Sequence, residues 1–148
     1  SILIGSEDPE CDPKEWIPNP DEFNREITDS QWKAQVYRCM RRIPTLEEPS
    51  RKRGVVDLYD VSDDWLPIYD STRIKGYYMA IGSSGNQFKN APIAGYCMAE
   101  LIEACEKGQN HDVDPVQVKT VYTGLTLNMG FYSRNREINP NSSFSVNG

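Results

Sequence analysis

The sequence is poor in the residues that build metal sites and hydrolase triads. It has one histidine, His111, and four cysteines, none of which forms a Cys-x-x-Cys pair. Because zinc sites draw several such ligands from short spacings, the sequence predicts no metal site. His111 lies in a polar turn with glutamine, asparagine and aspartate, where we expect it to be exposed, and this disfavours a Ser/His/Asp triad.

Long apolar runs and a basic charge balance are also missing. No stretch approaches the roughly 18 apolar residues of a membrane span, and no basic region followed by an apolar core marks a signal peptide. The net charge is −6, whereas a nucleic-acid surface is normally basic. We therefore expect neither a membrane nor a nucleic acid among the partners, and we interpret the scattered acidic residues as a solvated surface.

The cysteines fit a structural role. Cys39, Cys97 and Cys105 fall on the apolar faces of predicted helices, where free cysteine behaves as a small hydrophobic residue. Reduced, structural cysteines are typical of intracellular proteins. The sequence therefore predicts a cytoplasmic protein.

Size and composition allow one modest core. The 148 residues are 38% hydrophobic and 26% charged, an ordinary globular composition. The first five residues, SILIG, have the apolar pattern of a strand already under way. This favours a piece of a longer protein, although tag cleavage could also explain Ser1.

The first predicted helix runs from about Asp29 to Arg42. Thr28 and Gln31 have the spacing of a capping box, in which each side chain bonds the backbone of the other residue. Apolar residues recur at helical spacing along the segment. Pro44 is expected to stop the helix.

The second predicted helix runs from about Ala91 to Lys107. Apolar residues recur every four positions from Ile93, which is typical of one buried helix face. Pro92 suits the first helical turn, and Gly108 suits the C-terminal cap.

Three segments have strand character: residues 53–61, 65–69 and 77–81. The spacing of the first two predicts a hairpin through residues 62–64, in which Asp63 and Asp64 are solvated turn residues. In the tail, Asp114 and Pro115 predict a short helix over 115–122. Residues 125–131 could be helical or irregular, and 139–148 are expected to be turn-rich and extended.

These elements predict an α+β fold, with a small, mainly antiparallel sheet and two principal helices. The best local signal for a site is the strand, glycine-containing loop and helix of residues 77–107. Glycines let a ligand approach the backbone closely, and a helix N-terminus offers free N–H groups and partial positive charge. A phosphate, a carboxylate or the electron-rich edge of a reduced flavin would suit such a place, but a tight connection without a ligand fits the pattern too. The pattern is neither a Rossmann fingerprint nor a Walker loop, because the third glycine and the Gly-Lys-Ser/Thr sequence are missing.

Residues 54–68, GVVDLYDVSDDWLPI, resemble a recurring stretch of the sarcosine oxidase and dimethylglycine dehydrogenase group, within the D-amino-acid oxidase (DAO) superfamily. Residues 77–92 resemble the strand, loop and helix start of the same group, with its G-x-S-G-x-x-F-K-x-A-P pattern. Glu100-Leu101-Ile102 is similar to the end of the family's helix. The resemblance covers most of the chain, and its middle part is the specific one.

The resemblance implies an FAD-dependent oxidation of a secondary or tertiary amine, such as an N-methylated amino acid. It implies that residues 1–52 are a remnant of the substrate-binding domain and that 53–148 are the C-terminal part of the FAD-binding domain with a tail. The loop residues expected at the flavin are Gly82, Ser83, Ser84, Gly85, Asn86, Gln87, Phe88 and Lys89. Lys89 matches a family lysine that lies at the flavin and helps to bind the substrate carboxylate, so it is the catalytic-site candidate.

The sequence departs from the family at several points. The Gly-x-Gly-x-x-Gly element that grips the FAD pyrophosphate is absent, Asn86 stands where the oxidases often have histidine, and the expected strand before Tyr59 has no cysteine where some members attach flavin covalently. We therefore expect the chain alone to be inactive and to retain FAD poorly. Its expected partner is the missing FAD-binding region or a separate subunit, and it could self-associate through exposed apolar surface. The alternative is a non-enzymatic interaction module, or a subunit that completes a partner's flavin site.

Overall fold

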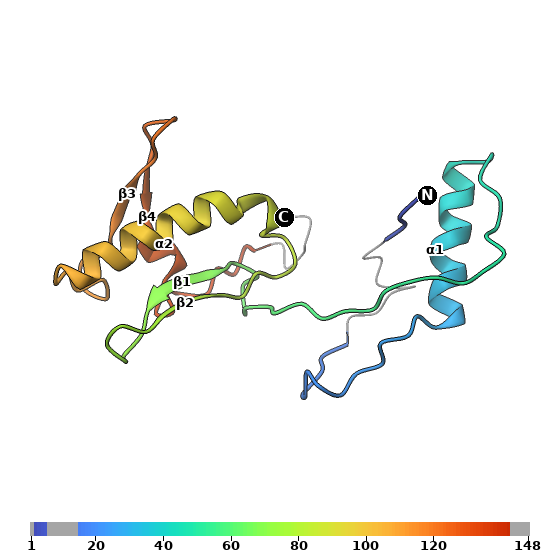
Figure 1. Cartoon of the computed structure of the whole chain (residues 1–148), viewed down its shortest axis with the longest axis horizontal. Helices are drawn as coiled ribbons and strands as arrows, with labels where there is room; N and C mark the ends of the chain where they lie inside the picture. Colours follow the sequence, from blue (N-terminus) through green and yellow to red (C-terminus); the bar gives the residue numbers. More distant parts are fainter. Residues whose placement is uncertain (1, 6–14, 143–148) are drawn as a thin grey trace. The chain divides into compact units, whose positions relative to one another are not determined.

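The computed structural model describes residues 2–5 and 15–142. Over these residues it is an α+β structure with two α-helices and two small antiparallel sheets of two strands each (Figure 1). The predicted fold class is therefore confirmed. The chain divides into two compact units, Ser1–Leu58 and Tyr59–Gly148.

The first unit is built on helix α1, Asp29–Arg42, which has the predicted bounds. The capping box forms as predicted: the Thr28 hydroxyl accepts the N–H of Gln31, and the Gln31 side chain accepts the N–H of Thr28, both at 3.3 Å. Such a box satisfies two of the N–H groups that a helix start leaves without partners. The local sequence therefore sets where this helix begins.

The predicted strand over residues 53–61 is not formed, since the segment has no regular secondary structure. Val55, inside it, is 87% exposed. A strand needs a neighbouring strand to hydrogen-bond its backbone and a core to cover its apolar face. Among the described residues, no strand pairs with this segment, so its β-branched residues do not make it a strand. The predicted hairpin through residues 62–64 is wrong for the same reason.

The hairpin that does form joins β1, Ile68–Ser71, to β2, Tyr78–Ile81. The strands are antiparallel, with Ile68 opposite Ile81 and Ser71 opposite Tyr78. The predicted strand at 77–81 is thus confirmed, and the one at 65–69 is shifted toward the C-terminus. Pro67 directly precedes β1, where a proline costs no ladder hydrogen bond.

Helix α2, Ala91–Glu106, follows a 3₁₀ turn at Phe88–Asn90 and packs against β1 (Figure 1). Its end is as predicted: Gly108 has a φ of +99°, and its N–H donates to the carbonyl of Cys105 at 2.9 Å. Left-handed backbone at this position is what glycine permits without strain.

The segment predicted as a short helix over 115–122 is instead strand β3, Gln117–Lys119, paired with β4, Thr126–Asn128. Val116 and Val118 are buried, whereas Gln117 and Lys119 are exposed. This alternation has the period of a strand. Burial of the two valines therefore outweighs the helix-start signal of Asp114 and Pro115. A second 3₁₀ turn, Met129–Tyr132, follows β4.

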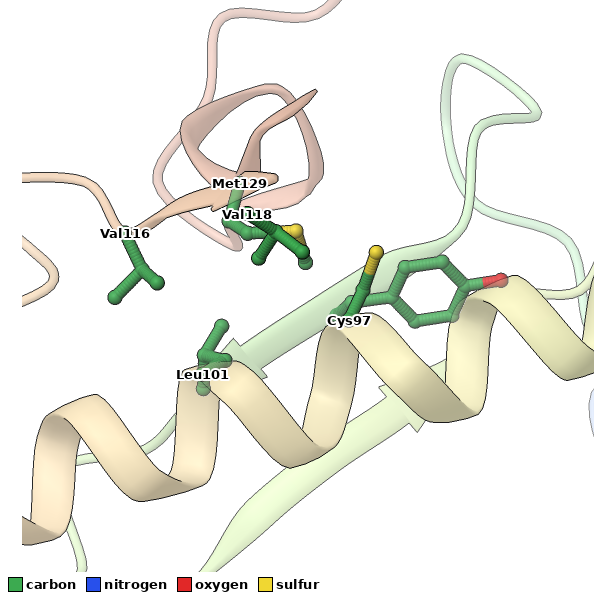
Figure 2. Packing of buried hydrophobic residues seen from close by; sticks show 6 residues of the cluster. Cys97, Leu101, Val116, Val118 and Met129 are labelled. Carbon is green, nitrogen blue, oxygen red and sulfur yellow. The ribbon is translucent and has the colours of Figure 1, made fainter. Parts of the chain in front are cut away.

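The core of the second unit joins β1, α2, β3 and the second 3₁₀ turn. Its members are buried hydrophobic residues: Tyr69, Cys97, Leu101, Val116, Val118 and Met129. Figure 2 shows Cys97 and Leu101 on α2 directed toward the side chains of the β3 segment and of the turn. The cysteines of the two helices are free, with Cys97 buried and Cys39 and Cys105 half-buried, as predicted for structural cysteines.

At the two ends of the chain, the structure describes little. Residues 2–5 have no regular secondary structure, so the predicted strand is not formed there. The tail has a turn at 139–142, with the Ser142 N–H bonded to the Asn139 carbonyl at 3.2 Å. The rest of the predicted extended tail, 143–148, lies outside the described residues. Within the described ranges, neither helix is long and apolar enough to cross a membrane.

Candidate functional site

The candidate loop, residues 82–87, joins β2 to the turn that precedes α2. Gly82, Ser84 and Gly85 all have left-handed backbone, with φ of +68°, +49° and +77°. For a residue with a side chain, this conformation costs on the order of 1–2 kcal/mol. Ser84 is nevertheless fully buried. Residues held in such conformations cluster at functional sites, because the surrounding structure must enforce them.

Asp60 holds the first half of the loop. The Ser83 N–H donates to one carboxylate oxygen at 3.0 Å, the Ser83 hydroxyl donates to the other, and the Ser84 N–H donates to the Asp60 carbonyl at 3.1 Å. Partial burial raises the pKa of Asp60, but the hydrogen bonds from Ser83 outweigh it and leave the pKa below its ordinary 3.8. Asp60 therefore occupies two backbone amides of the predicted loop, and the Ser83 carbonyl occupies a third, that of Asn86, at 3.1 Å.

A network of amide side chains fixes the second half of the loop. The Gln87 side-chain oxygen accepts the Tyr69 hydroxyl at 3.2 Å and the Asn90 amide at 3.1 Å, while its nitrogen donates to Asn86. Since both ends of the Gln87 amide have partners, its orientation is determined. The first N–H groups of the turn at Phe88 have no partner within the helix, as at any helix start.

Next to the loop lies an open groove between β2 and the N-terminal half of α2, with a volume of about 570 Å³. This volume falls within the range of small-molecule sites, roughly 300–1,000 Å³. The lining is mostly apolar and comes from Tyr69, Tyr78, Met79, Ala80, Ile81, Ser83, Gln87, Ala91, Ala94, Gly95, Met98 and Ile102. A side chain at Gly95 would meet nothing within 4 Å, so this part of α2 faces open space.

The polar groups of the groove sit at its two ends. Ser83, Gln87 and the Tyr69 hydroxyl lie on the loop side. At the other end, the Tyr78 hydroxyl donates to Glu106 at 2.7 Å, and this hydrogen bond raises the pKa of Tyr78 to about 12. Tyr78 therefore stays protonated at neutral pH and does not supply a base.

Of the eight predicted site residues, two line the groove and six do not. Ser83 and Gln87 line the groove. Phe88 is 97% exposed, and Lys89 is also exposed at the head of α2, and neither lines the groove. The groove and the charge of Lys89 are thus separate features of the same loop and helix start.

His111 was predicted to be exposed, and this prediction is wrong: its side chain is completely buried. Its Nδ1 accepts the N–H of Val116 at 3.1 Å, and its Nε2 lies 3.6 Å from a carboxylate oxygen of Asp70. Asp70 is itself fully buried and accepts the Ser133 hydroxyl at 3.0 Å and the Arg134 N–H at 2.7 Å. Because Nδ1 is engaged by the backbone and the ring is buried, His111 joins parts of the core.

Asp64 was predicted to be a solvated turn residue, and this is also wrong, although Asp63 beside it is exposed. Asp64 is fully buried and forms a two-pronged ion pair with Arg136, at 2.6 and 3.0 Å. No local signal could have revealed this pair, since its members are 72 positions apart. Asp70 offered one clue, because it directly follows the apolar segment 65–69 and a carboxylate buried there needs a partner.

Within the described ranges, no group of three or more histidine, cysteine, aspartate or glutamate residues is arranged to hold a metal ion. None of the protein-family models, curated proteins and solved structures compared with the chain matches it significantly. The function is therefore argued from the loop, the groove and the sequence.

Replacing Gly85 with alanine tests how tightly the loop is shaped. The new Cβ would lie 2.8 Å from the Tyr59 ring, and φ of +77° disfavours any side chain. Because the ring is 59% exposed and can move, we expect a loss of about 1–2 kcal/mol in the free energy of unfolding. Urea denaturation followed by circular dichroism measures it. Gly95→Ala, in open space within α2, is the control and should be neutral or stabilising; equal losses in both variants would contradict the shaped loop.

Proposed function

We propose that this chain supplies the flavin-facing loop and helix start of an FAD-dependent oxidoreductase that oxidises a secondary or tertiary amine, such as an N-methylated amino acid. The proposal is supported by the resemblance of residues 54–68 and 77–92 to the sarcosine oxidase and dimethylglycine dehydrogenase group. The single observation that carries it is the strained loop from Gly82 to Gly85, which lies at the head of α2 beside an apolar groove.

The residues at this place suit the electron-rich edge of an aromatic ring system. The head of α2 carries partial positive charge, although its Asn90 and Ala91 N–H groups donate to the Gln87 and Phe88 carbonyls, and Lys89 adds a full positive charge nearby. Such groups stabilise negative charge on a reduced ring. When bound, FAD would accept a hydride from the amine substrate.

The chain's own residues would then orient the flavin ring and the substrate. Ser83 and the fixed amide of Gln87 offer polar contacts at one end of the groove, and the lining from Ala91 to Ile102 offers an apolar surface to the ring. Lys89 would bind the carboxylate of an amino-acid substrate, as the family resemblance suggests. None of these residues is proposed as a base.

These 148 residues do not supply every part of an FAD site. A Gly-x-Gly-x-x-Gly turn for the pyrophosphate is absent from the sequence, and one loop does not replace it. We therefore propose that a further FAD-binding region or a partner subunit completes the site, that the chain alone is inactive, and that it works in a reducing, cytoplasmic setting that keeps its cysteines free.

A second candidate function is a non-enzymatic interaction module. The observation that favours it is exposed apolar surface near the groove, where Ile81 is 52%, Phe88 97% and Ile93 40% exposed. Apolar side chains gathered on a surface mark contact sites for proteins. This surface could bind the partner that completes the flavin site, or a second copy of the chain.

The proposed function is tested by sequencing the gene and its neighbours for an FAD-binding region, whose absence would refute the proposal, and by co-expressing that region with the chain and purifying the assembly. We expect bound FAD whose visible absorbance bleaches when N-methylglycine or N,N-dimethylglycine is added without oxygen. The 148-residue chain alone should retain no FAD. If the assembly binds FAD but no secondary or tertiary amine bleaches its absorbance, the proposed amine oxidation is refuted and the interaction module remains.

Lys89→Ala in that assembly tests the role of the lysine. Losing one charged contact to the substrate carboxylate should lower kcat/KM roughly tenfold, mainly through KM, with FAD content unchanged. Lys75→Ala, an exposed lysine in the turn between β1 and β2, is the matched control and should have no effect. If the two variants had equal kcat/KM, Lys89 would not bind the substrate carboxylate.

A further inference from the structure

Asp60 was not among the predicted site residues, yet it makes three hydrogen bonds to the loop. Its carboxylate accepts both the N–H and the hydroxyl of Ser83, and its carbonyl accepts the N–H of Ser84. The two segments are 23 positions apart in the sequence. This is a tertiary contact and does not follow from the local conformation of either segment.

The residue before it contacts the same loop. The ring of Tyr59 lies so close to Gly85 that an added Cβ would come within 2.8 Å of it. Tyr59 and Asp60 therefore hold the loop at two successive points, the ring against Gly85 and the carboxylate against Ser83.

The chemistry of the Asp60 contact is that of an anion site. A backbone N–H and a hydroxyl that converge on one place, in a loop with left-handed residues at Gly82, Ser84 and Gly85, are donors suited to a carboxylate or phosphate. Here the anion belongs to the chain itself. The lowered pKa of Asp60 agrees with donors that favour the ionised carboxylate.

We propose that Asp60 is a positioning residue of the candidate loop: its carboxylate fills the anion site at Ser83 and fixes the strained conformation of residues 82–85. That the loop faces a flavin rests on the proposed function, whereas the role of Asp60 in the loop does not.

If Asp60 acts as a built-in anion, its removal leaves a site that a small carboxylate can enter. In the ¹⁵N-labelled 148-residue chain, Asp60→Ala should shift the amide resonances of Ser83 and Ser84. Added formate should return them toward their wild-type positions in a saturable way. Chloride at the same concentration should return the resonances less, because a single spherical ion does not reproduce the two separate oxygens that accept the N–H and the hydroxyl of Ser83.

Two further variants make the result interpretable. Asp63→Ala removes an exposed carboxylate in the same unit, so it should leave both resonances in place and show no response to formate. Asp60→Asn keeps the size and one oxygen acceptor, so it should fold even if Asp60→Ala does not. It should shift the Ser83 and Ser84 resonances and show no formate response, because its amide still fills the site.

The outcomes separate this proposal from the proposed function. Formate recovery in Asp60→Ala supports the positioning role even if the wild-type assembly binds no FAD, in which case only the flavin is refuted. Unchanged Ser83 and Ser84 resonances in both Asp60 variants would overturn the proposal. So would a formate response in Asp60→Ala no greater than in Asp63→Ala. In an assembly that holds FAD, Asp60→Ala should also lower FAD retention, with partial recovery in formate.

Discussion

Replacing Asp64 with alanine should destabilise the unit Tyr59–Gly148 by about 3–5 kcal/mol, because it leaves a largely buried guanidinium without its counter-charge. The Arg136 side chain is 9% exposed, and both of its contacts to the Asp64 carboxylate are within 3.0 Å. The carboxylate also accepts the Leu66 N–H at 3.2 Å. Urea unfolding at neutral pH measures the loss.

Asp63→Ala is the control for this variant, since the two carboxylates are adjacent and Asp63 is exposed. A surface substitution of this kind changes stability by no more than about 0.5 kcal/mol. If both variants lost the same stability, the buried ion pair would not be what holds the tail to the segment before β1.

The same pair predicts how stability depends on pH. The hydrogen bond from Arg136 lowers the pKa of Asp64 to about 2, against the opposing effect of burial and with help from the Leu66 N–H. A carboxyl whose pKa is lower in the folded state stabilises the fold fully above its ordinary pKa near 3.8 and loses that contribution as the pH falls toward 2. The contribution is about 2 kcal/mol. Asp64→Asn should flatten the stability curve in this window, and an unchanged slope would contradict the assignment.

Leu101→Ala should cost the same unit about 2–5 kcal/mol, through lost apolar burial and the cavity left behind. Leu101 has no exposed surface and lies in the cluster that joins α2 to β1, β3 and the second 3₁₀ turn (Figure 2). A unit of this size has a total stability of roughly 5–13 kcal/mol. One side chain therefore carries a large share of it.

Ile93→Ala is the matched control for Leu101, because it removes a similar side chain that is 40% exposed on the same helix. We expect a loss below about 1 kcal/mol, since alanine also favours the helix. Thermal or urea unfolding of both variants gives the comparison. Similar losses would mean that the cluster is not the main core of the unit.

The helices could be predicted because their signals are local. The capping box of Thr28 and Gln31 and the glycine after α2 act through hydrogen bonds between residues three or four apart, so neighbours in the sequence specify them. The position of the candidate loop, between a strand and a helix, followed from the same kind of signal. The helix predicted at Pro115 failed because burial of Val116 and Val118 in the core outweighed the helix-start signal.

The sequence by itself determined the α+β class, both helices with their caps, and the place of residues 82–89 at the head of α2. The tertiary structure decided which strands pair, that Asp64, Asp70 and His111 are buried, and that Asp60 occupies the amides of Ser83 and Ser84. The physical reason is separation along the chain. A helix is specified by residues within one turn of each other, whereas a buried charge is tolerated only beside a partner that the fold brings from far away.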